Sequence, residues 1–433
     1  MKYLPYLPGC VALAAAFSIS AANTAVMEGV PPSRESQVTF ANYLKHPLST
    51  WAFSNMGAPT NVVMVPREGH ILDLGEPSQV DIGKRSFEDL KGNTLAFEQM
   101  FEDNYADGVV VINGDKLLYE QYFKILDQNK QHIWFSMTKS LVSTAFGLLV
   151  EADKVDLKAS PVKYIPELKG SGFERVTIQN VLDHDTAIDF KENYTDPESD
   201  FFRYYAPALN MVYLPGARDA QPDSSEIYGV HDFLVKFVNP NTALQPGDAF
   251  DYNSSNADVL GWLIARISGM NLADFIQQNI WSKLGAEHDA YFIVDRAYMP
   301  VATGGMNTTL RDAAKFGMMI RDRGEFRGRQ IIPADWVDAT LRVSRRLQTN
   351  MGKNPKYGND PWSAYHNMWW ILDDTAGEYC AVGVYGQVIY INRSANVVMA
   401  WFSSQPVASA ANNPDFHSKL KVARELANHI QAN

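Results

Sequence analysis

The chain has 433 residues, of which 46% are hydrophobic and 20% charged, and its formal net charge is -11. This composition is typical of a globular protein with ample apolar material for a core, and it excludes a chain that is disordered throughout. No cluster of five or more like charges occurs in the sequence. The acidity therefore indicates a solvated surface, and no nucleic-acid partner is expected because phosphate contacts need clustered lysines and arginines.

Residues 1–22 have the pattern of a secretory signal peptide. Lys2 gives a short positive start, residues 11–19 form a small apolar run, and small residues follow it. The run is too short to span a bilayer as a stable helix. It also follows Cys10, whereas a lipoprotein cleavage box needs the apolar stretch in front. We therefore expect a periplasmic or secreted protein with no stable membrane insertion after removal of the leader.

Removal of this leader would leave Cys380 as the lone cysteine. The mature chain could then form no intramolecular disulfide and no thiolate cage for a metal. His-Glu-x-x-His is absent, and the histidines are scattered without zinc spacing. We therefore expect neither a metal nor an organic cofactor, and we interpret Cys380, which lies inside an apolar segment, as a small core residue.

The first predicted elements follow a long irregular stretch. Residues 23–95 are rich in Pro, Gly and Ser, show little periodicity, and predict an irregular N-terminal arm. Gly108–Tyr122 predicts a β-hairpin, because strand-like runs flank the turn signal at residues 113–115. Ser136–Ala152 predicts a mostly buried helix without proline.

The rest of the chain has a helix-rich middle and a strand-rich end. Further helices are predicted over Ala257–Ile267 and Leu272–Lys283, from near Thr309, and over Ala423–Ile430. Strands are predicted at Tyr379–Val384, Gln387–Asn392 and Val397–Ser403. Strands near both ends predict an α+β fold, with one antiparallel sheet built from both chain ends and an inserted helix-rich lobe. We expect one catalytic domain over residues 96–433.

Ser136 and Lys139 open the buried helix with the chemistry of a nucleophile and a base. Serine is a weak nucleophile unless a base takes its proton. Positions three apart share one helix face, so the Lys139 amine can reach the Ser136 hydroxyl. Neighbouring apolar residues favour loss of charge from this lysine. The Ser136 N–H at a helix N-terminus would also stabilise an oxyanion. Ser-x-x-Lys alone is commonly a structural N-cap followed by a surface lysine, so the motif depends on its context.

A second segment supplies a tyrosine in a polar loop. Tyr252 lies between the turn at Pro246-Gly247 and the helix that contains Leu260-Gly261. A tyrosine here can relay a proton between the serine and a leaving group, provided that neighbouring positive charge lowers its pKa. The alternative is an ordinary packing residue.

Together these segments resemble class C β-lactamases, D-alanyl-D-alanine peptidases and related esterases. Ser136-x-x-Lys139 resembles their first motif and Tyr252-x-Ser254 their second. Three more stretches match in order: residues 180–185, residues 304–306 and residues 309–317. The similarity runs from about residue 108 to residue 403, and it implies a β-lactamase/transpeptidase-like fold.

Two departures narrow the resemblance. The third motif of the family, Lys-Thr-Gly or His-Thr-Gly, is absent near residues 378–380, where its side chains would help to hold a substrate carboxylate. Ser254 replaces the usual asparagine. With these differences the chain resembles the branch of 6-aminohexanoate-dimer hydrolases. That branch also has a tyrosine ahead of an acidic, proline-containing loop. That resemblance implies that Tyr194 touches the substrate amide, and we also expect Ser254 to bind substrate.

The prediction is a serine hydrolase that cleaves an amide or ester bond through an acyl-enzyme. Ser136 is the nucleophile, Lys139 and Tyr252 transfer the proton, and backbone N–H groups of Ser136 and of residues 381–384 hold the oxyanion. We expect short linear amides, peptides or carboxylic esters as small-molecule substrates, and the sequence leaves the oligomeric state open.

Several alternatives stay open. A D-alanyl-D-alanine carboxypeptidase or a β-lactamase is the rival enzyme, and a silent penicillin-binding-like sensor is the rival without turnover. No Gly-x-Ser-x-Gly elbow supports an α/β-hydrolase. His184-Asp185 can be read as a catalytic pair, but its place in the matched stretch favours a loop-stabilising role. The aromatic residues Trp362, Tyr365 and 369–370 can line a pocket or fill the core.

Overall fold

The computed structural model describes residues 26–194, 196, 198–211, 227–357, 361–408 and 414–432. The predicted leader, residues 1–22, lies outside the described residues. The chain divides into two compact units, Met1–Gln37 and Val38–Asn433. In the first unit the described part contains one 3-10 turn, Arg34–Ser36. All other elements belong to the second unit.

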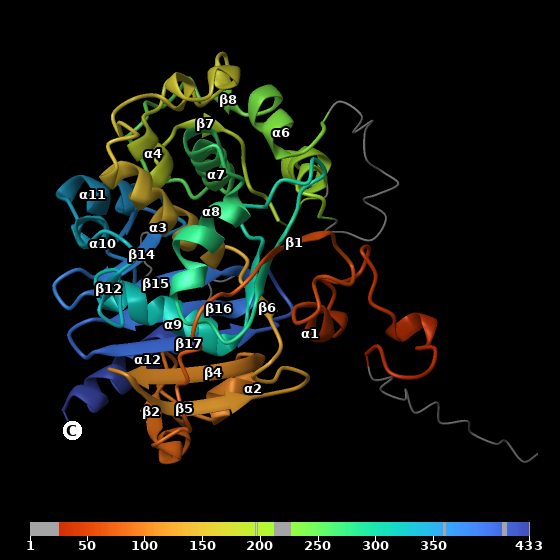
Figure 1. The fold of residues 1–433 in the computed structure, drawn as a ribbon, viewed down its shortest axis with the longest axis vertical. Coiled ribbons are helices and arrows are strands. Elements are labelled where there is room, and N and C mark those ends of the chain that lie inside the picture. The colour runs from red at the N-terminus through yellow and green to blue at the C-terminus, as the bar shows by residue number, and fades with distance from the viewer. Residues whose placement is uncertain are drawn as a thin grey trace, which may run out of the picture. The chain divides into compact units, whose positions relative to one another are not determined.

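A seven-stranded antiparallel sheet forms the base of the second unit (Figure 1). Its strand order is β13-β14-β15-β16-β17-β4-β5. The strands are β4 (Ala106–Asn113), β5 (Lys116–Tyr122), β13 (Ala364–His366), β14 (Trp369–Asp373), β15 (Glu378–Gly383), β16 (Gln387–Asn392) and β17 (Val397–Ser403). Strands from before and after the helical middle are neighbours at β17 and β4. The predicted α+β fold with a sheet from both chain ends is confirmed.

The predicted hairpin is the β4–β5 pair. Gly114 and Asp115 connect the two strands, and Gly114 has a φ of +57°, a left-handed conformation that glycine adopts without strain. β4 is buried along nearly its whole length, and β17 pairs with its other edge. The β-branched run of residues 109–112 suits such a central strand because its side chains pack on both faces.

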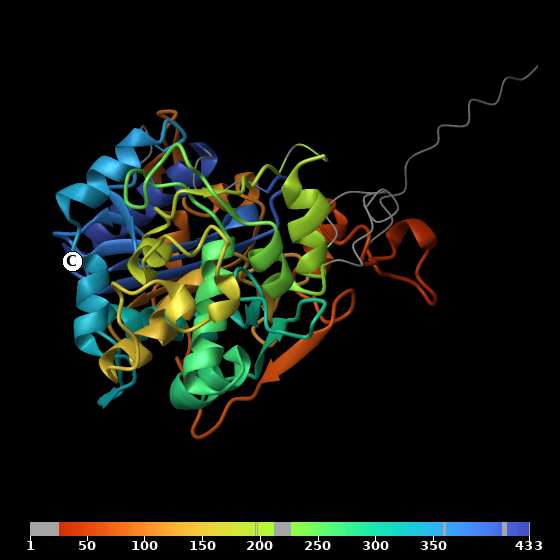
Figure 2. The same ribbon diagram turned by 90° about the horizontal axis from the view of Figure 1, so that it is seen from above.

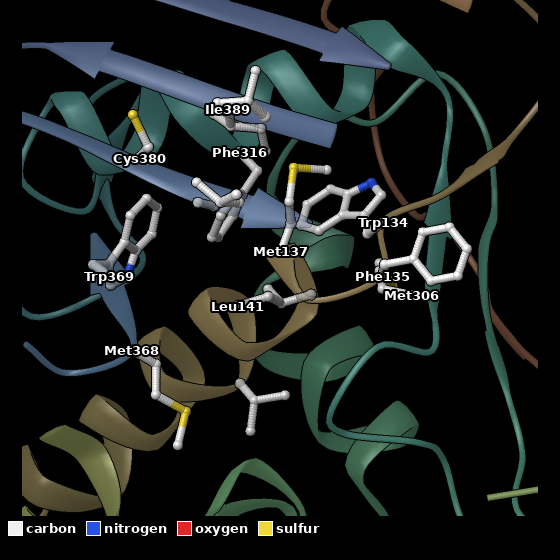
Figure 3. Packing of buried hydrophobic residues seen from close by; sticks show 14 of the residues in the cluster. Trp134, Phe135, Met137, Leu141, Met306, Phe316, Met368, Trp369, Cys380 and Ile389 are labelled. Carbon is white, nitrogen blue, oxygen red and sulfur yellow. The ribbon is translucent and has the colours of Figure 1, made fainter. Parts of the chain in front are cut away.

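Helices pack against both faces of this sheet and bury its apolar side chains. α9 (Leu310–Arg321) packs on β16, β17 and β4, α3 (Met137–Glu151) packs on β15, and α12 (Pro414–Gln431) contacts β16. Figure 3 shows Met137 and Leu141 of α3 with Phe316 of α9 and Ile389 of β16. The Phe135 ring points away from these side chains, although it directly precedes the helix.

The inserted lobe is helical and lies above the sheet in Figure 1 and in front of it in the view from above (Figure 2). Its helices are α4 (Ile178–Asp183), α5 (Ala206–Ala208), α6 (Val230–Lys236), α7 (Ser255–Ser268) and α8 (Leu272–Asn279). A π-helical turn, Phe201–Tyr205, precedes α5, and the short strands β7 (Ile188–Asp189) and β8 (Asn239–Pro240) pair within the lobe. α10 (Ala334–Leu341) and α11 (Arg345–Lys353) lead back to the sheet.

Most predicted elements have the observed boundaries within a few residues. The closing helix is the exception, because α12 begins nine residues before the predicted start at Ala423. α8 ends at Asn279, and a 3-10 turn (Trp281–Lys283) completes the predicted segment. Thr309 caps α9, since its side chain accepts the Asp312 N–H.

Part of the predicted arm contributes to a second sheet. β1 (Val62–Val65) pairs with β9 (Ala290–Ile293), which is followed in the order by β10 (Met306–Thr308) and β6 (His132–Ile133). Short elements also occur at α1 (Leu48–Ala52), a 3-10 turn over Val80–Lys84, β2 (Ser86–Glu88), β3 (Thr94–Ala96), α2 (Gln99–Asp103), β11 (Glu325–Phe326) and β12 (Arg329–Gln330). The domain boundary at residue 96 stays a prediction.

In the described part of the chain, no single helix has both the length and the apolar character to cross a membrane. The bent pair Ser255–Ser268 and Leu272–Lys283 passes that test by length and composition only.

Candidate active site

The turn that carries Ser136 connects a short strand to a long helix. β6 ends at Ile133, and α3 begins at Met137 with Ser136 as its N-cap. Between them Phe135 has a φ of +46°, a left-handed conformation that turns the chain sharply. The Trp134 N–H is hydrogen-bonded to β10. Ser136 therefore occupies the predicted position at the N-terminus of a buried helix.

The Lys139 side chain extends from the same helix to Ser136. Its Nζ donates to Ser136 Oγ at 2.8 Å and to Thr303 O at 2.9 Å. Lys139 is 1% exposed, and burial lowers its pKa to about 8, while the charges of Glu192 and Asp258 act in the opposite direction. Near pH 8 a large fraction of this amine is neutral and able to accept the Ser136 proton.

Tyr252 lies across from these residues, in the loop before α7. Lys139 Nζ is 5.2 Å from the centre of its ring, which stacks on Trp370 with centroids 5.5 Å apart. Burial raises the pKa of Tyr252, and a side-chain hydrogen bond with Ser136 opposes this only in part. The condition of a lowered pKa is therefore not met, because burial and the negative charge of Glu192 both raise the pKa of Tyr252. A phenol that keeps its proton suits a donor to a leaving group.

His184 braces the loop that carries Tyr252. It follows α4 with a φ of +53°. Its Nδ1 accepts the Asn253 N–H at 3.0 Å, and its carbonyl accepts the Asp251 N–H at 2.8 Å. Burial lowers the pKa of His184 well below its usual range, so the imidazole is neutral. The residues before and after Tyr252 in the chain are thus both hydrogen-bonded to His184.

The Asp185 carboxylate is bound by residues other than the adjacent His184. Its carboxylate accepts hydrogen bonds from Asn180 Nδ2 at 2.7 Å and from Asn350 Nδ2 at 3.2 Å, and it forms an ion pair with Arg346. This carboxylate ties α4 to α11. His184 and Asp185 are therefore arranged as structural supports and not as a catalytic pair.

Glu192 joins the two residues that were predicted to contact substrate. The Tyr194 hydroxyl donates to Glu192 Oε2 at 2.7 Å, and the Ser254 backbone N–H donates to Oε1 of the same carboxylate. Glu192 belongs to the stretch that carries the resemblance, but sequence reasoning gave it no role. The signal was its spacing from Tyr194, because residues two apart in an extended segment point to the same side.

A pocket of about 480 Å³, part of it open to solvent, contains Ser136. Its lining combines aromatic and aliphatic side chains with a few hydroxyl groups, and none of the described residues in it is charged. The lining residues are Phe135, Ser136, Tyr194, Phe201, Tyr205, Leu209, Met211, Ser254, Thr303, Gly304, Val384, Tyr385 and Ala408. Ser136, Tyr194 and Ser254 thus line one pocket, whereas Lys139 and Tyr252 are not among its lining residues. An apolar pocket with a few polar groups is the common form of a small-molecule site.

Asp258 lies behind Lys139 on α7. Asp258 Oδ1 accepts the Thr303 N–H at 3.1 Å, and Oδ2 accepts the Tyr205 hydroxyl. Since Lys139 donates to the carbonyl of the same Thr303, one residue separates the amine from this carboxylate. Burial raises the pKa of Asp258 to about 7. Sequence reasoning missed Asp258, whose signal was an acidic residue in the apolar stretch that starts at residue 257.

The aromatic segment near the C-terminus belongs to the core. None of Trp362, Tyr365, Trp369 and Trp370 lines the pocket around Ser136, and all four are buried. Tyr365 and Trp370 pack against the Tyr252 ring and so support it from behind. Cys380 is buried in β15, and burial raises the pKa of its thiol well above the usual range. No group of three or more His, Cys, Asp or Glu side chains in the described ranges is placed to hold a metal ion.

Comparisons with known proteins show what this chain is similar to. A family model described as Beta-lactamase matches residues 97–424. A protein of Paenarthrobacter ureafaciens named 6-aminohexanoate-dimer hydrolase is 28% identical over 377 residues, which are 87% of this chain and 90% of the relative. A solved structure from Bacillus anthracis, "Putative 6-aminohexanoate-dimer hydrolase", is 25% identical with a TM-score of 0.79 and covers 93% of this chain and 99% of its own. A penicillin binding protein from Bacillus halodurans, 15% identical with a TM-score of 0.53 over 76% of this chain and 99% of its own, shares the fold.

Proposed function

This chain belongs to the beta-lactamase family of serine hydrolases, and from that premise we propose that it cleaves an amide or ester bond through an acyl-enzyme formed on Ser136. The observation that carries the proposal is the 2.8 Å hydrogen bond from Lys139 Nζ to Ser136 Oγ in a buried setting. A serine hydroxyl attacks carbonyls slowly unless an adjacent base removes its proton. A buried amine at this distance is such a base.

The proposed reaction has two halves. Neutral Lys139 takes the Ser136 proton while Oγ forms a bond to the carbonyl carbon, and the Ser136 N–H at the start of α3 and backbone N–H groups of residues 381–384 stabilise the oxyanion. Tyr252 then protonates the leaving nitrogen or oxygen as its bond to carbon breaks, and it regains a proton from the Lys139 ammonium. A water molecule then gives a proton to the same amine and attacks the acyl carbon. The bond from this carbon to Ser136 Oγ breaks, Oγ regains its proton from the Lys139 ammonium, and the acid is released.

The pocket favours uncharged acyl groups. No lysine or arginine is among its described lining residues, and the family's Lys-Thr-Gly motif is absent from β15. A substrate carboxylate would lose its hydration there without a charged partner, which is costly. We propose short linear amides, peptides or carboxylic esters as substrates, and the name of the Paenarthrobacter relative, 6-aminohexanoate-dimer hydrolase, supports a linear amide. The charged ends of such a dimer lie several methylene groups from its amide, whereas the carboxylate of a β-lactam or a D-Ala-D-Ala peptide lies close to the bond that is cleaved. β-Lactams and D-Ala-D-Ala peptides should be poor substrates.

One panel of substrates tests the proposal. The purified protein would be incubated with p-nitrophenyl esters, linear aminohexanoate amides, D-Ala-D-Ala peptides and nitrocefin, and labelled with a fluorophosphonate probe. We expect ester or amide turnover and labelling that both disappear in Ser136→Ala. Ser140→Ala is the matched control, since Ser140 lies on the same helix but donates to Met368 O at 2.7 Å, so it should keep its labelling. Turnover that survives in Ser136→Ala would refute the proposed nucleophile.

Export to the periplasm or the medium is a separate proposal that rests on residues 1–22 alone. N-terminal sequencing of the protein recovered from the periplasm or culture medium should find a start near residues 21–24. Recovery of the full-length chain from the cytoplasm alone would contradict it.

A further inference from the structure

The carboxylate of Glu192 lies at the junction of two segments that build the proposed site. It accepts the Tyr194 hydroxyl at 2.7 Å through Oε2 and the Ser254 backbone N–H through Oε1. Ser254 is the N-cap of α7 and lies two residues after Tyr252. One half-buried side chain therefore bridges the loop of Tyr194 and the loop of Tyr252.

The charge of Glu192 acts on the proposed base. No lysine or arginine in the described ranges forms an ion pair with this carboxylate, and its charge raises the pKa of Lys139, as does that of Asp258 behind the same amine. The other titratable groups that face Lys139 are the Tyr252 phenol and the His184 imidazole, which is neutral. Glu192 and Asp258 are thus the anions that favour the ammonium form.

We propose that Glu192 is a positioning residue of this site, which holds Tyr194 against the Tyr252 loop and uses its negative charge to set the charge state of Lys139. The inference rests on the proposed function, because it assumes that Lys139 is the base. It adds an acidic residue to a site that was predicted from a serine, a lysine and a tyrosine.

A purely structural brace would act differently from a charged one. Loss of a brace lowers the rate at every pH, because the reacting groups are held less well. Loss of the negative charge also destabilises the Lys139 ammonium, so the amine becomes neutral at lower pH. Activity depends on neutral Lys139 and rises as pH increases through its pKa. Removal of the charge should therefore move the acidic limb of the pH profile to lower pH.

The test compares pH profiles of kcat/KM with p-nitrophenyl butyrate in the full-length protein. Glu192→Gln keeps the shape of the side chain and removes its charge, and we expect its acidic limb to move down by about one pH unit and its plateau to fall about tenfold. Glu192→Asp keeps the charge but shortens the reach to Tyr194, so its limb should stay near the wild-type position while the plateau falls. Glu198→Gln, an exposed carboxylate of the same segment, should change neither.

Each result of this test supports or overturns one part of the proposal. If the acidic limb of Glu192→Gln lies at the wild-type pH or at a higher pH, the electrostatic role is overturned. If the plateau of kcat/KM is unchanged in both Glu192 variants, the positioning role is overturned. Thermal unfolding of each variant identifies a failure to fold, in which case Glu192→Asp carries the test of positioning. If the wild-type protein has no Ser136-dependent turnover, the proposed function fails instead, and this outcome is distinct from the others.

Discussion

Lys139 Nζ donates a hydrogen bond to Ser136 Oγ over 2.8 Å, one helical turn along α3. The same amine also donates to the carbonyl oxygen of Thr303, which lies in the loop before β10. Hydrogen bonds to two parts of the chain therefore fix its position. Lys139 is almost fully buried, and no carboxylate contacts it directly among the described residues. This amine is therefore held for exchange of a proton with Ser136 and not for a surface ion pair.

The pH profile should show the ionisation of Lys139. Burial lowers its pKa to about 8, and only the neutral amine accepts a proton. Activity should therefore be low well below pH 8 and rise as pH increases through about 8. Initial rates on a p-nitrophenyl ester, measured from pH 6 to pH 10 at constant ionic strength, would check this. A profile that falls over this interval would contradict the assignment of the base.

Replacement of Lys139 by Met should remove the proton acceptor while its apolar stem is largely kept. We expect kcat to fall by about 10³-fold or more, as is typical for members of a nucleophile–base set. Single-turnover kinetics would separate loss of acylation from loss of binding. Near-wild-type turnover in Lys139→Met would rule out this proton path.

His184→Ala should loosen the Tyr252 loop without removing a catalytic proton. The variant leaves the Asn253 N–H without its buried acceptor, which costs about 1–3 kcal/mol of stability. We expect a lower midpoint of urea unfolding and a reduced kcat. The wild-type pH profile should have no limb near 6.5, because burial keeps the pKa of His184 well below that value. A limb near 6.5 that disappears in His184→Ala would favour the catalytic pair instead.

Gly383→Ala should disturb the site through the backbone. A Cβ at Gly383 would lie 2.3 Å from the Trp134 carbonyl oxygen, in the turn that carries Ser136. The end of β15 must then move away from this turn, which should lower kcat/KM by roughly 10- to 100-fold and stability by about 1–3 kcal/mol.

Gly352→Ala is the matched control for Gly383→Ala. Nothing lies within 4 Å of a Cβ at this exposed position in α11, so its stability should be unchanged or rise by up to about 1 kcal/mol with activity retained. Full activity of Gly383→Ala would show that close approach of β15 to the Ser136 turn is not required.

Local patterns in the sequence determined the elements and the first half of the site. Alternating or continuous β-branched runs predict strands, and a helix period predicts α3, so Ser136 and Lys139 meet by spacing on one helix alone. The resemblance to a known family then brought Tyr252, Tyr194 and Ser254 into one prediction. Such short-range patterns do not encode contacts between residues far apart in sequence, such as the hydrogen bond from Lys139 to Thr303 O.

Tertiary structure alone decided the electrostatics of the site. The pKa of Tyr252 is raised because rings from distant strands, including Trp370, exclude water from it, whereas sequence reasoning required it to be lowered. Glu192 and Asp258 became part of the site only because the lobe folds back over α3, which places carboxylates far apart in sequence around one amine. Charges act through space, so their effect depends on distances that only the folded chain defines.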